Sequence, residues 1–188
     1  MNEPASAQTP RPSGELELTD RLIAQLEPHF DLTRQVWLRH PLDGLDCRID
    51  LVALPRPPLD ERFPFPLFGV EVKADSNELR QMTQAYKQCL DYQRCILNDP
   101  RLPKLRACAL PCVALYRGRH GDRFPDDPME TLAVRLVGKY NVGVLEHARY
   151  GLELRICDER IWSARQGVSD SKTAWPATRL VANSRQRR

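Results

Sequence analysis

The amino-acid sequence predicts a mixed α/β domain with a small central sheet. Segments whose apolar residues recur at helical spacing alternate with short apolar segments of strand length. The chain has 188 residues, of which 41% are hydrophobic and 28% are charged, an ordinary composition for a globular protein. This length suits one domain with tails, so we expect a flexible tail over 1–14, a domain over 15–165 and a basic C-terminal tail over 166–188.

The N-terminal half is expected to hold one helix and three strands. Leucine and isoleucine at helical spacing predict a helix over about Leu16–Glu27, which ends where a proline follows. Short apolar runs predict strands over 35–39, 47–54 and 67–73. The last two of these strands matter most, because each carries charged residues among apolar ones.

A loop with five prolines, residues 55–66, separates the second and third predicted strands. Proline has no backbone N–H to donate to a neighbouring strand, so this segment is not a central strand. Phe63 and Phe65 within the loop could stack on nucleic-acid bases or wedge a duplex open. We favour the alternative, in which both rings pack the loop onto the domain.

The C-terminal half is expected to hold two helices and three strands. A long helix is predicted to start at the capping residue Asp75 and to carry an apolar stripe as far as Leu97. A strand over 107–117 follows, and a further helix over 127–137 comes next. The predicted closing strands cover 142–146 and 152–157.

Three charged residues stand on two otherwise apolar strands. Alternation puts Asp50 on the face opposite Ile49 and Leu51, and puts Glu71 and Lys73 together on one face. A charge buried in a sheet needs a partner or a metal ion, because losing its hydration is costly. Two carboxylates at the ends of adjacent strands can share one Mg²⁺ or Mn²⁺, and an ammonium beside them can orient a water molecule or offset charge on a phosphate.

With these residues the sequence resembles the PD-(D/E)xK nuclease superfamily, which includes restriction endonucleases, Holliday-junction resolvases and recombination exonucleases. The resemblance runs over about Leu16–Val113 and rests on four features. They are a leading helix with an acidic residue, a strand ending in Arg48–Asp50, a strand ending in Glu71–Lys73, and a helix with glutamines. It implies a restriction-endonuclease-like core, in which a central mixed sheet of four or five strands is flanked by helices. Ile49 stands where the family name has proline, a common variation in the superfamily.

The resemblance also implies which residues perform catalysis. Asp50 and Glu71 match the positions that bind the metal ion in the superfamily, and Lys73 matches its catalytic lysine. The implied cofactor is Mg²⁺ or Mn²⁺, and the implied activity is hydrolysis of phosphodiester bonds, with DNA as the expected substrate.

Two accessory residues are implied as well. The first helix is expected to supply a further carboxylate, for which Glu17 is our choice, with Glu15 and Asp20 as alternatives. In some branches of the superfamily a glutamine on the helix after the lysine assists catalysis. Gln88, followed on the same helix face by Tyr92, fits that role best, and Gln84 is second.

A basic segment, residues 117–123, is a candidate contact for nucleic acid. Arg117, Arg119 and Arg123 in this segment could bind phosphates, although solvated surface arginines would have the same pattern. We expect nucleic acid as the partner, with DNA preferred, and allow for a homodimer. No recognised helix-turn-helix or zinc finger is visible, so sequence-specific reading is not predicted.

The sequence predicts a cytoplasmic protein with no membrane partner. No apolar run approaches the length of a membrane-spanning helix, and the N-terminal segment lacks the apolar core of a secretory signal. The six cysteines are therefore expected to be free thiols. Their spacing does not match the usual pairs of a metal cluster, which makes an iron–sulfur cluster the weaker interpretation.

Two hypotheses compete with the metal-dependent nuclease. The first is a catalytically inactive protein of the same fold that binds nucleic acid through its arginines. The second is a protein-interaction module whose basic stretches contact an acidic partner. Intact Asp50, Glu71 and Lys73 favour catalysis over both, because an inactive site would usually have lost one of them.

Overall fold

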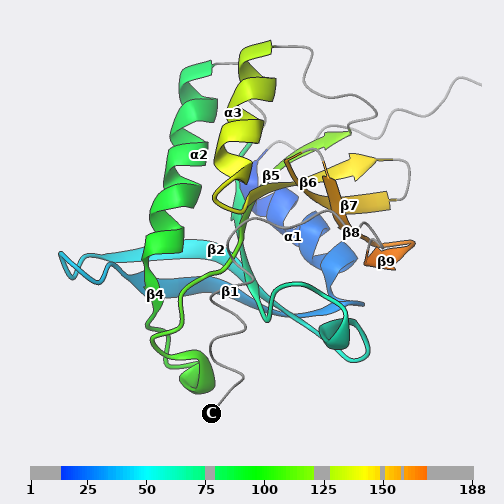
Figure 1. The fold of residues 1–188 in the computed structure, drawn as a ribbon. Coiled ribbons are helices and arrows are strands. Elements are labelled where there is room, and N and C mark those ends of the chain that lie inside the picture. Colours follow the sequence, from blue (N-terminus) through cyan, green and yellow to red (C-terminus); the bar gives the residue numbers. More distant parts are fainter. Residues whose placement is uncertain (1–13, 75–78, 121–127, 149–150, 158, 169–188) are drawn as a thin grey trace, which may run out of the picture.

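The computed structural model describes residues 14–74, 79–120, 128–148, 151–157 and 159–168, and Figure 1 draws its fold. Within these ranges the helices are α1 (Glu15–Leu26), α2 (Leu79–Arg94) and α3 (Pro128–Gly138), with 3-10 turns η1 (Leu59–Glu61) and η2 (Pro103–Leu105). The strands are β1 (Phe30–Arg39), β2 (Asp46–Pro55), β3 (Phe68–Val72), β4 (Ile96–Leu97), β5 (Val113–His120), β6 (Val142–Ala148), β7 (Gly151–Ile156), β8 (Glu159–Ser163) and β9 (Gly167–Val168).

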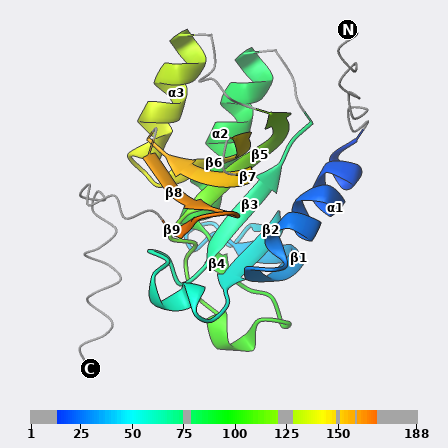
Figure 2. The ribbon, with the colours of Figure 1, turned by 90° about the vertical axis from the view of Figure 1, so that its right-hand side faces the viewer.

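The nine strands of the described chain form one mixed sheet in the order β4-β1-β2-β3-β5-β6-β7-β8-β9. β5 runs parallel to β3 and β6, whereas the other neighbours pair antiparallel. The sheet curls into a half-barrel, and α1 lies along its inner side (Figures 1 and 2). The expected restriction-endonuclease-like core, with a central sheet of four or five strands flanked by helices, is therefore wrong.

The curl follows from the apolar faces of the C-terminal strands. β7 and β8 bury Leu152, Leu154 and Trp162 in the same core as the α1 side chains. A flat sheet would hold these strands away from α1 and leave their apolar side chains in water. Bending the sheet around the helix buries them, and the natural right-handed twist of strands favours such coiling.

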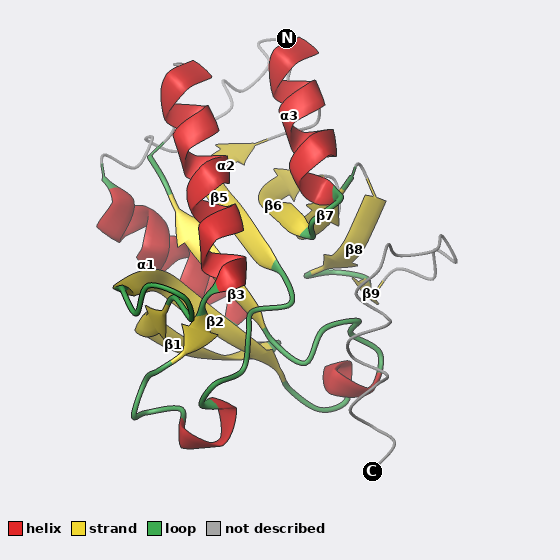
Figure 3. Cartoon of the chain, turned by 60° about the vertical axis from the view of Figure 1, so that its left-hand side comes forward, coloured by secondary structure: helices red, strands yellow, loops and turns green. Residues whose placement is uncertain are grey.

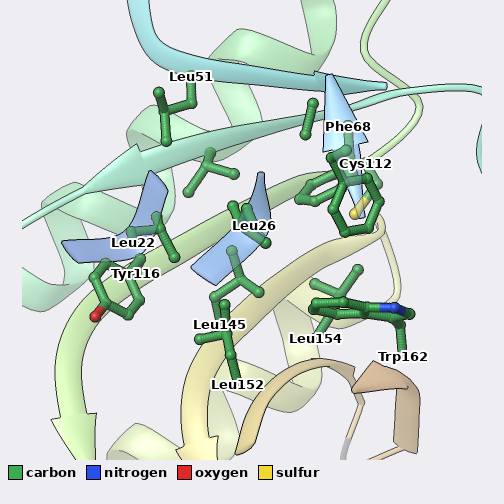
Figure 4. Packing of buried hydrophobic residues seen from close by; sticks show 14 of the residues in the cluster. Leu22, Leu26, Leu51, Phe68, Cys112, Tyr116, Leu145, Leu152, Leu154 and Trp162 are labelled. Atoms are coloured by element: carbon green, nitrogen blue, oxygen red, sulfur yellow. The ribbon is translucent and has the colours of Figure 1, made fainter. Parts of the chain in front are cut away.

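Two cores lie on opposite sides of the sheet. The inner core packs Leu22 and Leu26 of α1 against side chains from β2, β3, β5, β6 and β7 (Figure 4). The outer core lies beneath α2 and α3, which run side by side across the other face (Figure 3). Met82, Tyr86 and Cys89 line the α2 surface that faces the sheet, as the predicted apolar stripe requires.

Aromatic rings fill the inner core near the start of β1. Phe30 contacts Phe63, Phe68 and Trp162 edge-on, with ring centroids 5.0–5.4 Å apart. Phe63 and Phe65 of the proline-rich loop are buried in this core. The packing interpretation of the two rings is thus confirmed, and the alternative of stacking on bases is excluded for the rings in this position.

Several element boundaries differ from the prediction. β1 begins at Phe30, five residues before the predicted strand, and Ile96–Leu97 forms β4 instead of ending the second helix. β5 begins at Val113, because the backbone from 107 to 112 lies mostly in a loop. β8 and β9 were not predicted, and β9 extends the sheet to Val168, inside the predicted tail. The proposed helix cap at Asp75 lies outside the described residues.

The described helices include none with both the length and the apolar composition that a membrane-crossing segment requires.

Candidate active site

Asp50 and Glu71 lie on neighbouring antiparallel strands. In the register of β2 and β3, Leu51 pairs with Val70, so the next pair along would join Asp50 and Glu71. At this position a side chain accepts a hydrogen bond from the β3 backbone. The Val72 N–H donates to Asp50 Oδ2 at 2.8 Å. The Asp50 carboxylate is thereby held against the end of β3, where Glu71 and Lys73 emerge.

β1 changes faces beside Asp50. Phe30 and Leu32 pack into the inner core, whereas Val36 and Leu38 pack into the outer core. These residues would share one face of a regular strand, because side chains alternate with a period of two. The change occurs at Gln35, whose φ of 50° is unusual for a residue other than glycine.

β2 changes faces at the matching position. Ile49 packs into the outer core, while Leu51 and Ala53 pack into the inner core. The prediction that Ile49 and Leu51 share one face is therefore wrong. Gln35 and Asp50 lie between the register pairs Arg34–Leu51 and Val36–Ile49, where both strands change faces, and Gln35 Nε2 donates to Asp50 Oδ1 at 2.9 Å.

Glu71 is the buried carboxylate of the site, with 2% of its surface exposed. Its Oε1 contacts Lys73 Nζ at 2.6 Å, and its Oε2 is buried with no hydrogen-bond partner among the described residues. Burial raises the pKa of Glu71 to about 7; the hydrogen bond from Lys73 opposes this, and the charge of Asp50 adds to it. The site therefore holds one carboxylate oxygen that no donor in the described part of the chain satisfies.

Lys73 and Glu15 complete the charge distribution. Burial lowers the pKa of Lys73, but the hydrogen bond to Glu71 and the charges of Glu71, Glu15 and Asp50 raise it, and the net direction is upward. The Lys73 side chain is one-third exposed, so its ammonium reaches solvent. Glu15 opens α1 and also acts electrostatically on Glu71.

The acidic residues of α1 differ in position. Glu15 is the one whose charge raises the pKa of both Glu71 and Lys73. Asp20 forms an exposed ion pair with Arg34 at 2.8 Å. Glu17, our choice from the sequence, is exposed in the first turn of α1, as is Glu15. The electrostatic effect on Glu71 and Lys73 favours Glu15, which the sequence offered as an alternative.

Gln88 approaches the site through a tyrosine. Its Nε2 donates to the Tyr92 hydroxyl at 2.6 Å, and this hydroxyl donates to the Arg48 carbonyl at 3.0 Å. Burial raises the pKa of Tyr92, and the charge of Glu71 raises it further. Gln88 and Tyr92 therefore hold β2 two residues before Asp50. Gln84, the second candidate, is exposed on α2.

The predicted nucleic-acid contacts are only partly described. Arg117 lies on β5 with 7% of its surface exposed, which leaves little of its guanidinium open to a phosphate. The side chain of Arg119 and the whole of Arg123 lie outside the described residues.

Three residues around the site were missed by sequence reasoning. They are Gln35, Asp99 and Arg101. Tyr92 lies one helical turn after Gln88 and bonds to it, as their shared helix face in the sequence predicts. Gln35, Asp99 and Arg101 gave no signal, because their roles depend on how β1 is bent and on which loop lies beside it.

Asp50 and Glu71 are the carboxylates that the site could offer to a metal ion. No group of three or more His, Cys, Asp or Glu side chains able to hold a metal occurs within the described ranges. Mg²⁺ is usually held by one or two carboxylates together with water and substrate phosphate, so these two side chains are compatible with such an ion.

The six cysteines pack in or against the two cores. All six are free thiols in the structure, and Cys89 and Cys112 are fully buried. Burial raises the pKa of both of these thiols.

Comparison of the chain with protein-family models, with curated proteins and with solved structures finds no match.

Proposed function

We propose that this protein is a nuclease that hydrolyses phosphodiester bonds, with DNA as its substrate and Mg²⁺ or Mn²⁺ as its cofactor. One observation carries the proposal. Glu71 is buried with an unsatisfied carboxylate oxygen, beside Asp50 and Lys73, at the end of a strand. A buried carboxylate without a full set of partners is unfavourable for folding, and a divalent cation would compensate its charge.

Asp50 and Glu71 would hold the ion. The two carboxylates supply few ligands, so most positions around the ion stay open to water and to a substrate phosphate. When bound, the ion would polarise the scissile phosphate and make water a stronger nucleophile at neutral pH. Val72 is buried in the inner core, and its carbonyl is a further oxygen that the ion could use.

Lys73 would act on the substrate. Its ammonium contacts Glu71 and reaches solvent, so it can donate to a non-bridging phosphate oxygen. This contact would strengthen as negative charge develops on the phosphate. The attacking water gives up a proton to solvent as its oxygen bonds to phosphorus. The opposite phosphorus–oxygen bond breaks, and the leaving sugar oxygen takes up a proton from solvent. The products are a phosphate monoester and an alcohol.

The test is cleavage of linear and circular DNA, single- and double-stranded, with Mg²⁺ or Mn²⁺. Asp50→Asn is compared with wild type and with Asp46→Asn, which changes an exposed aspartate on the same strand. We expect wild type and Asp46→Asn to cut DNA and Asp50→Asn to be inactive. Equal cleavage by all three proteins, or cleavage by none, would refute the proposal. The pattern of products then separates end cleavage from internal cleavage.

A non-catalytic nucleic-acid-binding module is the second candidate. The Lys73–Glu71 ion pair favours it, because an internal cation already neutralises part of the carboxylate charge. This candidate predicts DNA binding that weakens steeply with salt, together with no cleavage and no response to Mn²⁺. A titration of the protein with Mn²⁺, together with the cleavage assay, therefore separates the two proposals.

A further inference from the structure

Gln35 connects Asp50 to a second ion pair, formed by a buried Asp99 and a half-exposed Arg101. The Gln35 side chain donates to Asp50 Oδ1, and its main-chain carbonyl accepts from Arg101 Nη2 at 2.9 Å. Arg101 in turn forms an ion pair with Asp99 at 2.7 Å. Gln35 on β1 therefore contacts both Arg101, in the loop after β4, and the Asp50 carboxylate on β2.

Asp99 anchors this connection. Its side chain is fully buried and accepts from the Trp37 N–H at 3.1 Å and from the Arg101 N–H and Nε, each at 2.9 Å. The Arg101 hydrogen bonds hold the pKa of Asp99 well below its usual range, although burial opposes this. The pair therefore fixes the β1 backbone on both sides of Val36, at the Gln35 carbonyl and at the Trp37 amide.

The backbone of Gln35 needs such support. A left-handed φ in a residue with a side chain is unfavourable and persists only where neighbouring contacts hold it. The same conformation aims the Gln35 amide at Asp50. Asp50 then has one fixed donor for each oxygen, Gln35 for Oδ1 and Val72 for Oδ2.

We propose that Gln35 is a positioning residue that fixes the Asp50 carboxylate for metal binding, and that Asp99 and Arg101 hold Gln35 in place. The inference rests on the proposed function. Groups that hydrogen-bond to a metal-binding carboxylate set its orientation, and their loss typically weakens metal affinity about 10–100-fold. Without Gln35, Asp50 would keep only the Val72 bond and could rotate about it.

The test measures Mn²⁺ affinity of the full chain by titration, following free Mn²⁺ by electron paramagnetic resonance. Gln35→Met keeps the length of the side chain and removes its donor. We expect its Mn²⁺ Kd to rise about 10-fold, its kcat to fall and its KM for DNA to stay unchanged. Gln25→Met is the matched control, because Gln25 lies on α1 and donates to the Arg21 carbonyl. We expect this control to bind Mn²⁺ like wild type.

The outcomes are distinguishable. Unchanged Mn²⁺ affinity in Gln35→Met, or a raised KM with unchanged Mn²⁺ affinity, would overturn the positioning role. A wild-type protein that binds no Mn²⁺ would instead overturn the proposed function itself. If Gln35→Met does not fold, Arg101→Lys gives the same readout, because lysine cannot bridge Asp99 and the Gln35 carbonyl together. Its control is Arg39→Lys, which alters an exposed pair on β1.

Discussion

At Glu71 a single residue that would bind the metal ion also lowers the stability of the folded protein. Its carboxylate sits in the interior with one oxygen unsatisfied, and its partner Lys73 is one-third exposed. Removing one member of a buried ion pair is usually destabilising, because the other charge is left without a partner in a dry environment. Here the remaining charge, Lys73, can turn to water. The carboxylate is therefore the unfavourable member of the pair.

Glu71→Met should stabilise the metal-free protein. Replacing the buried carboxylate by an apolar side chain of similar volume should raise the free energy of unfolding by about 1–2 kcal/mol. Urea denaturation with EDTA present measures this change. A loss of stability would mean that the Glu71–Lys73 pair is a structural ion pair.

The same substitution should remove the response to metal. Wild type in Mn²⁺ at about 100 times its Kd should gain about 2.7 kcal/mol of stability, whereas Glu71→Met should gain none. Asp46→Asn serves as the control that retains the full gain. Equal stabilisation of wild type and Glu71→Met by Mn²⁺ would place the ion elsewhere.

His29 should make stability depend on pH. It is half-buried against Phe30 and Trp162, and burial lowers its pKa. The unfolded chain then takes up a proton more readily than the folded chain as pH falls below about 6.5. The contribution of His29 to stability should therefore be complete above that pH and be lost towards pH 5, while the raised pKa of Glu71 acts in the opposite direction in both proteins. Thermal unfolding of wild type and His29→Gln across this range checks the sign: stability of wild type relative to His29→Gln should decrease towards pH 5, and a constant difference between the two would contradict it.

At the scale of elements, the position of α1 depends on a glycine in β5. Gly118 has a φ of 66°, and Leu18 of α1 packs directly over its Cα. A side chain at this position would overlap Leu18. Because α1 also carries Glu15 to the site, the fit between helix and strand affects the charge around Glu71.

Gly118→Ala should be more destabilising than Gly44→Ala. Both glycines have left-handed φ values, which disfavour alanine by about 1–2 kcal/mol. Only Gly118 adds a steric overlap, for which overpacking typically adds about 1–3 kcal/mol, whereas nothing lies near Gly44. Urea denaturation of both variants gives the comparison, and similar losses would show that Leu18 moves aside freely.

The sequence predicts the helices and strands around the site better than it predicts where they end or change direction. α1 and α3 and the strands that carry Asp50 and Glu71 follow from periodicity, because each has a continuous apolar pattern. Ile96 and Leu97 continue the spacing of α2 yet pair as β4, since the helix ends at Arg94 and β1 offers a free edge. The shift at Gln35 and Asp50 interrupts alternation in two strands at once, which no single-strand pattern reveals.

At the scale of the whole molecule, the two ends of the sheet meet through the inner core. Trp162 of β8 lies against Phe30 of β1, with ring centroids 5.0 Å apart and both side chains fully buried. This contact joins strands that are separated by most of the chain and by five other strands of the sheet. The half-barrel should therefore unfold as one unit.

Trp162→Ala should destabilise the protein by about 3–5 kcal/mol, because it opens a large cavity in the inner core. Trp162→Phe should lose less, about 1–2 kcal/mol, since the Trp162 indole nitrogen has no hydrogen-bond partner among the described residues. Trp37→Ala is the surface control, because Trp37 is 45% exposed. Urea denaturation followed by circular dichroism should show one transition for each variant. Two transitions would mean that the C-terminal strands unfold separately.

The overall sheet could not be predicted, although most of its strands could. The motif residues Asp50, Glu71 and Lys73 suggested a compact sheet, but the sheet width depends on β7, β8 and β9 continuing around α1. The curl of the sheet depends on contacts between residues far apart in the sequence, such as that between Trp162 and Phe30. Local periodicity carries no information about these contacts.

The shift of faces at Gln35 and Asp50 also determines where the β1–β2 hairpin tolerates changes in length. Insertions between Arg39 and Asp46 lie beyond the ion pair that these two residues form, and they leave the register of the paired strands intact. A peptide tag or a fluorescent label grafted there should not disturb Asp50. Deleting one residue between Gln35 and Arg39 would instead turn Trp37 inward and Leu38 outward. Natural variation in length should therefore be confined to the hairpin tip.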